Sequence, residues 1–156
     1  MTIFVVRHAK AGERSKWDGD DRQRPLSKDG RQQAIQLAQR LANENIVRLV
    51  TSPHLRCRQT LEPLAELVEL PIEVDERLAE NQDFTGALEL LESCPDGAVL
   101  CSHGDVIPAL IDSLTRRNMR IVGEPEWSKA STWLIDRISD MYFSASSWPP
   151  PEKWDL

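Results

Sequence analysis

The sequence has few cysteines, and nothing in their spacing suggests a metal site or a disulfide framework. The three are Cys57, Cys94 and Cys101. Their number is odd and their separations match no zinc-binding pattern. Reduced thiols in a cytosolic protein are the simplest interpretation, and we therefore expect a cytoplasmic location.

Long apolar runs and an excess of positive charge are also missing. No apolar stretch approaches membrane-spanning length, so we expect no membrane partner. The chain starts directly on a strand pattern, which predicts that it carries no secretion signal. The formal net charge is −6 and no basic stripe dominates, which argues against a nucleic acid polymer as partner. A small anionic substrate stays compatible with this charge, because a local cluster of arginines can reverse its sign inside a cleft.

What the chain does contain is an alternation of strand and helix patterns. Its 156 residues, 40% hydrophobic and 28% charged, are enough for one folded domain. We expect strands at 2–7, 46–50, 72–74, 98–101 and 132–135, and helices after Ser27, after Pro53, at 87–91 and at 106–114. This alternation predicts an α/β fold, a three-layer αβα sandwich with a mostly parallel central sheet.

The remaining segments are polar or rich in proline. Residues 10–25 are charged and predict a long loop, and residues 138–143 are expected to form a hairpin with the strand at 132–135. From residue 144 onward the prolines and tryptophans indicate an extended tail. The expected organisation is therefore a domain over 1–143 and a C-terminal tail over 144–156. His54 is expected at an exposed position of a helix.

Two of the predicted strands end in a histidine. Arg7 and His8 follow the first strand, His103 follows the strand at 98–101, and Arg56 lies one turn into the helix after the second strand. Because ligands bind at the carboxyl ends of strands in such sheets, these four side chains are expected to meet in one crevice.

Two arginines and two imidazoles suit a tetrahedral dianion. The arginine fork binds two phosphate oxygens at once, and an imidazole can donate through one nitrogen while the other attacks. A histidine so placed can accept a phosphoryl group covalently. Spacing alone leaves structural roles open, because histidines at strand ends commonly serve as hydrogen-bonding groups.

Three segments carry a family resemblance: Val6-Arg7-His8-Ala9, Thr51-Ser52-Pro53-x-x-Arg56-x-x-Gln59-Thr60 and Cys101-Ser102-His103-Gly104. Their order and separation resemble the signature segments of the histidine phosphatase (phosphoglycerate mutase-like) superfamily. Arg24-Pro25-Leu26-Ser27-x-x-Gly30 is similar to the family's Pro-Leu-Thr-x-x-Gly segment. The chain departs from the usual Arg-His-Gly sequence at Ala9. In its short length the chain resembles compact bacterial phosphohistidine phosphatases. The stretches 7–29 and 102–109 resemble the phosphatase domain fused to some Nudix hydrolases.

The resemblance implies a phosphoglycerate mutase-like fold and a catalytic role for each motif residue, with no metal or cofactor. It makes His8 the nucleophile that becomes phosphohistidine and His103 the donor that stabilises the transferred phosphoryl group. The residues expected to bind the substrate are Arg7, Arg56, Ser102 and Gly104.

A leaving alkoxide also needs a general acid. Many relatives have a glutamate after the third strand, and Glu80 lies in the matching region. We favour Glu80 for this role and place Asp105, two residues beyond His103, second. A solvated loop charge is an equally good interpretation of Glu80.

Three functional hypotheses follow. The first is a phosphatase acting on a phosphorylated small metabolite or nucleotide through His8. The second is a phosphatase of phosphohistidine-bearing proteins. The third is a catalytically silent phosphate-binding or interaction module, and the presence of all four of Arg7, His8, Arg56 and His103 counts against it. The sequence does not indicate the oligomeric state.

Overall fold

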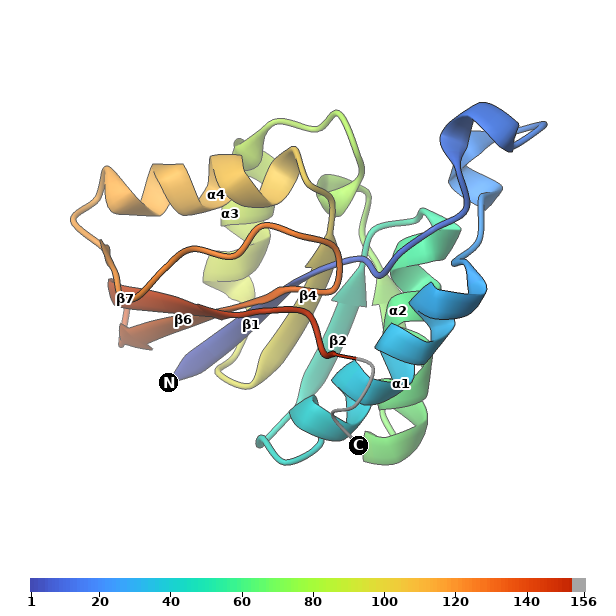
Figure 1. Cartoon of the computed structure of the whole chain (residues 1–156). Coiled ribbons are helices and arrows are strands. Elements are labelled where there is room, and N and C mark those ends of the chain that lie inside the picture. The colour runs from blue at the N-terminus through green and yellow to red at the C-terminus, as the bar shows by residue number, and fades with distance from the viewer. Residues whose placement is uncertain (153–156) are drawn as a thin grey trace.

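A seven-stranded sheet forms the middle layer of the computed structural model, which describes residues 1–152 (Figure 1). The strand order is β3-β2-β4-β1-β6-β7-β5. The strands are β1 Thr2–Arg7, β2 Arg48–Thr51, β3 Ile72–Val74, β4 Ala98–Ser102, β5 Arg120–Ile121, β6 Thr132–Ile138 and β7 Met141–Trp148. The first four are parallel, and β6 runs antiparallel to both β1 and β7. The predicted αβα sandwich with a mostly parallel sheet is confirmed.

Helices cover both faces of the sheet. Helices α1 (Lys28–Leu41) and α2 (Leu55–Val68) lie together on one face, and α3 (Phe84–Ser93) and α4 (Val106–Thr115) on the other (Figure 1). No helix within residues 1–152 has the length and apolar character needed to cross a bilayer.

Strand β1 shows why the sheet is buried on both sides. Ile3 and Val5 belong to the core shared with α3 and α4, whereas Phe4 and Val6 belong to the core shared with α1 and α2. Successive side chains of a strand point to opposite faces, so a continuous apolar run is what a strand between two helical layers requires.

Strand register brings the predicted site residues to one edge. Arg7 pairs with Ser102, and Thr51 pairs with Cys101 in the neighbouring parallel strand. The residues that follow each strand therefore emerge side by side at the carboxyl edge of the sheet.

The C-terminal segment differs from the expectation. Strand β7 continues through Trp148, so residues 144–148 are part of the sheet and not of a separate tail. Its two buried side chains, Tyr142 and Ala145, are three residues apart because the pairing with β6 skips Phe143, and this bulge lets both reach the core under α3 and α4. The last part of the predicted tail, residues 153–156, lies outside the described residues.

The segment 10–25 is a loop, as predicted, but it is ordered by local structure. It contains two short 3-10 turns, Arg14–Lys16 and Asp21–Gln23, and a β-bridge joins Ala11 to Leu26. The loop extends beyond the carboxyl ends of the strands, where it forms one wall of the site (Figure 1).

Candidate active site

His8 and His103 face each other at the carboxyl edge of the sheet. Their ring centroids lie 5.4 Å apart at an interplanar angle of 63°. His8 follows β1 and is 5% exposed, and His103 follows β4 and is 1% exposed. The central geometric expectation, that two strands bring two imidazoles together, agrees with this arrangement.

One hydrogen bond fixes the tautomer of His8. Its Nδ1 lies 2.8 Å from the carbonyl oxygen of Ala9. A carbonyl oxygen only accepts, so Nδ1 carries the hydrogen and Nε2 keeps its lone pair. Burial lowers the pKa of His8 to about 3, with Arg56, Arg7 and Lys129 lowering it further against the opposing effect of the Ala9 bond. The ring is therefore neutral at physiological pH and has a free nucleophilic nitrogen.

The opposite nitrogen of His103 is held by a serine. Nε2 of His103 lies 2.8 Å from Oγ of Ser52, and this oxygen also accepts the backbone N–H of His54 at 3.2 Å. Ser52 is fully buried. If Nε2 donated, the hydroxyl hydrogen would be left in the interior without an acceptor, which is costly. Ser52 therefore donates to Nε2, and the hydrogen of the His103 ring resides on Nδ1.

This Nδ1 atom points toward the cavity. It is buried and has no hydrogen-bond partner among the described residues, and the nearest carboxylate oxygen is Oε2 of Glu80 at 3.5 Å. Burial lowers the pKa of His103 to about 2, and His8, His54, Arg56 and Arg7 lower it further. His103 is thus a neutral donor aimed at the space beside His8.

A third imidazole is buried next to His103. His54 is 5% exposed, and its ring lies 4.5 Å from that of His103, centroid to centroid, at 71°. Burial, followed by Arg56 and Arg22, lowers the pKa of His54. The expected exposed helix position is wrong, because His54 precedes α2 as its N-cap residue and turns inward over the sheet edge.

Arg7 and Gly104 form a close pair. A Cβ atom at position 104 would lie 2.7 Å from Cζ of Arg7, so only glycine lets the guanidinium approach this backbone. Nη1 of Arg7 donates to the carbonyl of Trp127 at 2.7 Å, and Nε is buried without a partner among the described residues. These contacts hold the guanidinium of Arg7 beside His8 and leave its Nε–H available to a ligand.

Arg56 is fully buried and two carboxylates shield it from the cavity. Its Nη2 donates to Oε2 of Glu80 at 2.6 Å and lies 3.2 Å from Oδ2 of Asp21. Its Nη1 donates to the carbonyl of Asp21 at 3.0 Å. In this arrangement a phosphoryl oxygen can reach Arg56 only if Glu80 gives up its contact.

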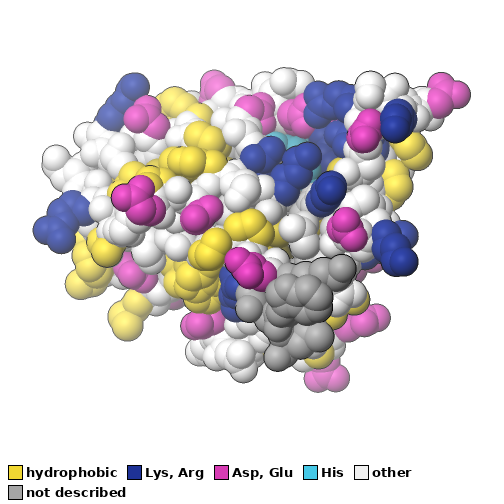
Figure 2. Space-filling view, in the orientation of Figure 1, with side chains coloured by type: hydrophobic (Ala, Val, Ile, Leu, Met, Phe, Trp, Pro, Cys, Tyr) yellow, Lys and Arg dark blue, Asp and Glu magenta, His cyan; other side chains and the backbone are white. Residues whose placement is uncertain are grey.

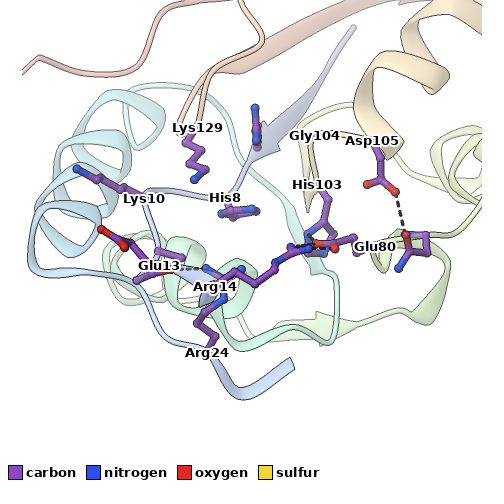
Figure 3. Close-up of a pocket in the computed structure, with 14 residues that line it drawn as sticks. His8, Lys10, Glu13, Arg14, Arg24, Glu80, His103, Gly104, Asp105 and Lys129 are labelled. Carbon is purple, nitrogen blue, oxygen red and sulfur yellow. Dashed lines mark hydrogen bonds and ion pairs between the residues drawn. The ribbon is translucent and has the colours of Figure 1, made fainter. Parts of the chain in front are cut away.

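The two predicted acids occupy different positions. Both oxygens of Glu80 accept hydrogen bonds from Arg14, at 2.9 and 3.1 Å, in addition to the bond from Arg56. Oδ2 of Asp105 accepts the backbone N–H of Asn81 at 2.8 Å and so fastens the loop that carries Glu80 (Figure 3). Glu80 is the carboxylate next to His103.

Ser102 does not fit its predicted role. Its hydroxyl donates to the carbonyl of Leu78 at 2.7 Å, and the side chain is 1% exposed. The hydroxyl thus fastens the turn before Glu80 to β4. Its backbone carbonyl accepts the N–H of His8 at 3.1 Å, which extends the pairing of β1 with β4 by one residue.

A cavity of about 610 Å³ opens in front of the two histidines. In Figure 2 a histidine surface lies in a hollow among lysine and arginine side chains, although the chain is acidic as a whole. The basic residues of the lining are Arg7, Lys10, Arg14, Arg24 and Lys129 (Figure 3). Within residues 1–152 no three His, Cys, Asp or Glu side chains are arranged to hold a metal ion.

Residues 3–87 match the sequence model of the histidine phosphatase superfamily (branch 1). The chain belongs to this superfamily. The match ends before His103, so the pairing of the second histidine with His8 is a structural observation independent of it.

Ala9, where histidine phosphatases usually have glycine, is fully buried and donates its N–H to Thr60 at 2.9 Å. Its φ is not positive, so the backbone accommodates alanine.

Curated relatives are longer than this histidine phosphatase chain. An 8-oxo-(d)GTP phosphatase of Mycolicibacterium smegmatis is 36% identical over 97% of the chain, which spans 49% of that protein. The transcription factor tau 55 kDa subunit of Saccharomyces cerevisiae is 33% identical over 51% of the chain, and this match covers 20% of the yeast protein. The chain therefore corresponds to about half of the first relative, and the matched half of the chain corresponds to a fifth of the second.

Solved histidine phosphatase structures share the fold. The protein histidine phosphatase SixA complexed with tungstate superposes with a TM-score of 0.74 at 23% identity, covering 94% of each chain. A mycobacterial glucosyl-3-phosphoglycerate phosphatase with bound VO3 superposes with a TM-score of 0.70 at 18% identity, covering 96% of this chain and 99% of that one.

Sequence reasoning missed two residues that the structure brings to the centre of the site. Ser52 lies within one recognised motif, but nothing in the pattern indicated that its hydroxyl reaches His103. Lys129 precedes a strand and has no motif around it, yet it lines the cavity beside Arg7. Both positions depend on contacts between segments that are far apart in the sequence.

Proposed function

We propose that this protein is a phosphatase that hydrolyses a phosphomonoester of a small metabolite or nucleotide through a covalent phosphohistidine on His8. One observation carries the proposal: the bond from Nδ1 of His8 to Ala9 leaves Nε2 unprotonated, on a neutral ring that faces His103 across a basic cavity. A neutral, oriented imidazole is what nucleophilic attack on phosphorus requires.

In the first step Nε2 of His8 forms a bond to phosphorus and the bond from phosphorus to the leaving oxygen breaks. Arg7 binds the phosphoryl oxygens, and Nδ1–H of His103 donates to one of them as charge develops. Arg56 joins them when Glu80 releases it. In the second step water attacks the phosphohistidine, which yields inorganic phosphate and returns His8 to its neutral form.

Glu80 is the better placed proton donor of the two predicted acids. It adjoins His103 at 3.5 Å, whereas Asp105 accepts a backbone hydrogen bond from Asn81. If Glu80 moves away from Arg56 toward the substrate, Arg56 becomes available to the phosphoryl group. The same movement brings the carboxyl group of Glu80 to the leaving oxygen. Gly104 supports the site by letting Arg7 approach, and Ser102 supports it from behind through Leu78.

The likeness to the mycobacterial 8-oxo-(d)GTP phosphatase, which extends over nearly the whole chain, supports a nucleotide as substrate. The fold likeness to SixA supports the second candidate, a phosphohistidine protein phosphatase, because the hollow is open to solvent (Figure 2). In neither case do the donors present suit a metal: cations surround the histidines and would repel it.

A substrate panel tests the proposal. Nucleotides, sugar phosphates and a phosphorylated histidine-containing carrier protein are compared by kcat/KM, with a chelator present and absent. We expect turnover of a nucleotide or metabolite, no effect of the chelator, and a far larger loss in His8→Ala than in Glu80→Gln. Preference for the carrier protein selects the second candidate. Absence of turnover on every compound favours the silent module and overturns the proposal. Equal turnover by His8→Ala and the parent excludes His8 as the nucleophile and overturns it as well.

A further inference from the structure

Lys129 lies above His8 on a segment that is fastened to the end of β1. The backbone N–H of Ala130 donates to the carbonyls of both Arg7 and His8 at 3.1 Å, and the N–H of Arg7 donates to Ser131 at 3.0 Å. The side chain of Lys129 descends from this segment toward His8 (Figure 3). The ammonium group is thus placed by the same strand end that places the nucleophile.

The turn that holds Lys129 adopts an uncommon conformation. Ala130 has φ 68°, in the left-handed region that alanine rarely occupies, and it is fully buried. Backbone in this region persists only where surrounding contacts impose it, and it concentrates at functional sites. Here the imposed conformation has a visible consequence, which is the position of Lys129 over the cavity.

The positive charge of Lys129 has no counter-ion in the part of the chain that the structure describes. Within residues 1–152 neither Lys129 nor Lys10 takes part in an ion pair, whereas Arg14, Arg24 and Arg56 share the carboxylates of Asp21 and Glu80. Burial lowers the pKa of Lys129, and Arg7, Arg24, Lys10 and Arg56 lower it further. These cations repel one another in an otherwise acidic chain, and an anion between them would relieve the repulsion.

The cavity is also larger than one phosphoryl group needs. Its volume of about 610 Å³ falls in the range of sites that enclose an entire small ligand. Arg7 and His103 already serve the phosphoryl group that is transferred to His8. Lys10, from the loop after β1, and Lys129, from the segment before β6, line the same cavity and have no assigned part in that transfer.

We propose that Lys129, with Lys10 beside it, binds a second phosphoryl group joined to the transferred one, so that the substrate is a diphosphate or longer polyphosphate ester. This inference rests on the proposed transfer of a phosphoryl group to His8, and it moves the bond that is cleaved from a phosphate ester to a phosphoanhydride. Nε2 of His8 bonds to the terminal phosphorus, the phosphoanhydride P–O bond breaks, and the electron pair leaves on the bridging oxygen as part of the departing phosphate. Water then releases inorganic phosphate from His8.

A phosphate leaving group also agrees with the contacts of Glu80. Such a group departs as a stable anion and needs little help from an acid. Glu80 is held by Arg14 and Arg56 as an ion-pair partner. Lys129 supplies what this departure does need, a cation beside the oxygen on which negative charge accumulates.

Comparison of two substrates in Lys129→Met tests the subsite. ADP and p-nitrophenyl phosphate both have leaving groups that depart without a strong acid, and only ADP has a second phosphoryl group. We expect the wild-type kcat/KM to be higher for ADP, and the ratio of the two kcat/KM values to fall about tenfold in Lys129→Met, because a charge-assisted contact to the second phosphate is lost. Lys129→Arg is expected to restore most of the ratio.

Lys28→Met is the matched control, because Lys28 is an exposed lysine at the start of α1 outside the cavity. We expect its ratio to equal that of the wild type. A wild type that hydrolyses p-nitrophenyl phosphate but does not prefer ADP, or a ratio that Lys129→Met leaves unchanged, overturns the subsite while the proposed phosphatase stands. A wild type inactive on both compounds overturns the proposed function and the subsite with it.

Discussion

The hydroxyl oxygen of Ser52 lies 2.8 Å from Nε2 of His103, the ring nitrogen opposite the one that faces Glu80. Since the same oxygen accepts the N–H of His54, its own hydrogen is directed to His103. A residue at the end of β2 thereby determines which nitrogen of a histidine after β4 carries the proton. This is an indirect role, in which Ser52 acts on the reaction through the tautomer of His103.

Removal of this hydroxyl is expected to slow the reaction. In Ser52→Ala, Nε2 of His103 loses its hydroxyl donor and keeps only the weaker contact with Sγ of Cys57 at 3.5 Å, so the Nδ1–H tautomer is less favoured and we expect kcat to fall about tenfold. Nitrogen NMR of the imidazole is expected to report the Nδ1–H form in the wild type and a mixture in the variant.

Ser113→Ala is the control for this change, because Ser113 is also buried and donates its hydroxyl to a backbone carbonyl, that of Leu110 within α4. Each variant is expected to lose about 1 kcal/mol of unfolding free energy. An equal effect of both variants on kcat, or an unchanged His103 spectrum in Ser52→Ala, would show that Ser52 only stabilises the fold.

The two buried histidines predict how stability depends on pH. Both have folded-state pKa values, about 3 for His8 and about 2 for His103, below that of an unfolded histidine. The unfolded chain therefore binds protons first as the pH falls, and the folded state loses stability below about pH 6.5. Between pH 6.5 and 5 each histidine is expected to cost about 1.5 kcal/mol of unfolding free energy.

Urea unfolding at pH 7, 6 and 5 measures this loss, and His8→Gln serves as the comparison because glutamine does not titrate there. We expect the decrease in unfolding free energy to be smaller in His8→Gln by about 1.5 kcal/mol. An identical pH dependence in both proteins would mean that the pKa of His8 is not lowered by folding. His8 would then be partly protonated near neutral pH and could not serve as the neutral nucleophile.

The close approach of Arg7 to Gly104 predicts a functional defect from a single methyl group. In Gly104→Ala the new Cβ would lie 2.7 Å from Cζ of Arg7, so the guanidinium must move. The end of an arginine side chain shifts easily, and we therefore expect little change in thermal stability but a loss of about tenfold or more in kcat/KM. Gly12→Ala, at a cavity position with no heavy atom within 4 Å of the added Cβ, is expected to retain activity. Comparable kcat/KM values for the two variants would contradict the placement of Arg7.

Glu80→Gln separates two roles of one carboxylate. If Glu80 protonates the leaving oxygen, the variant loses more activity on AMP, whose leaving alkoxide needs a proton, than on p-nitrophenyl phosphate, and we expect a difference of about tenfold or more. Glu76→Gln provides the control, because Glu76 pairs with Arg22 on the exposed side of the same loop region. A uniform loss on both substrates would indicate that Glu80 only holds Arg14 and Arg56.

The sequence predicted the layers of the fold and the edge where the site lies, because buried parallel strands have continuous apolar runs and deliver the next residue to a common edge. It did not predict the continuation of β7 to Trp148, since three serines and one alanine at 144–147, shortly before three prolines, have no strand signature. The burial of His54 and the hydrogen bond from the Ser102 hydroxyl to the carbonyl of Leu78 both depend on contacts with distant segments. No local pattern indicates that Ala130 adopts a positive φ. The position of the neighbouring Lys129 could therefore not be predicted from the sequence.

Direct detection of the intermediate tests the central claim. The wild-type protein, mixed with substrate and quenched in alkali, which preserves phosphohistidine, is digested and examined by mass spectrometry, and NMR of the phosphoprotein identifies the nitrogen that carries phosphorus. We predict a phosphoryl group on Nε2 of His8 that appears and decays at rates consistent with turnover. Phosphorus on another residue, or sustained turnover by His8→Ala, would contradict the account.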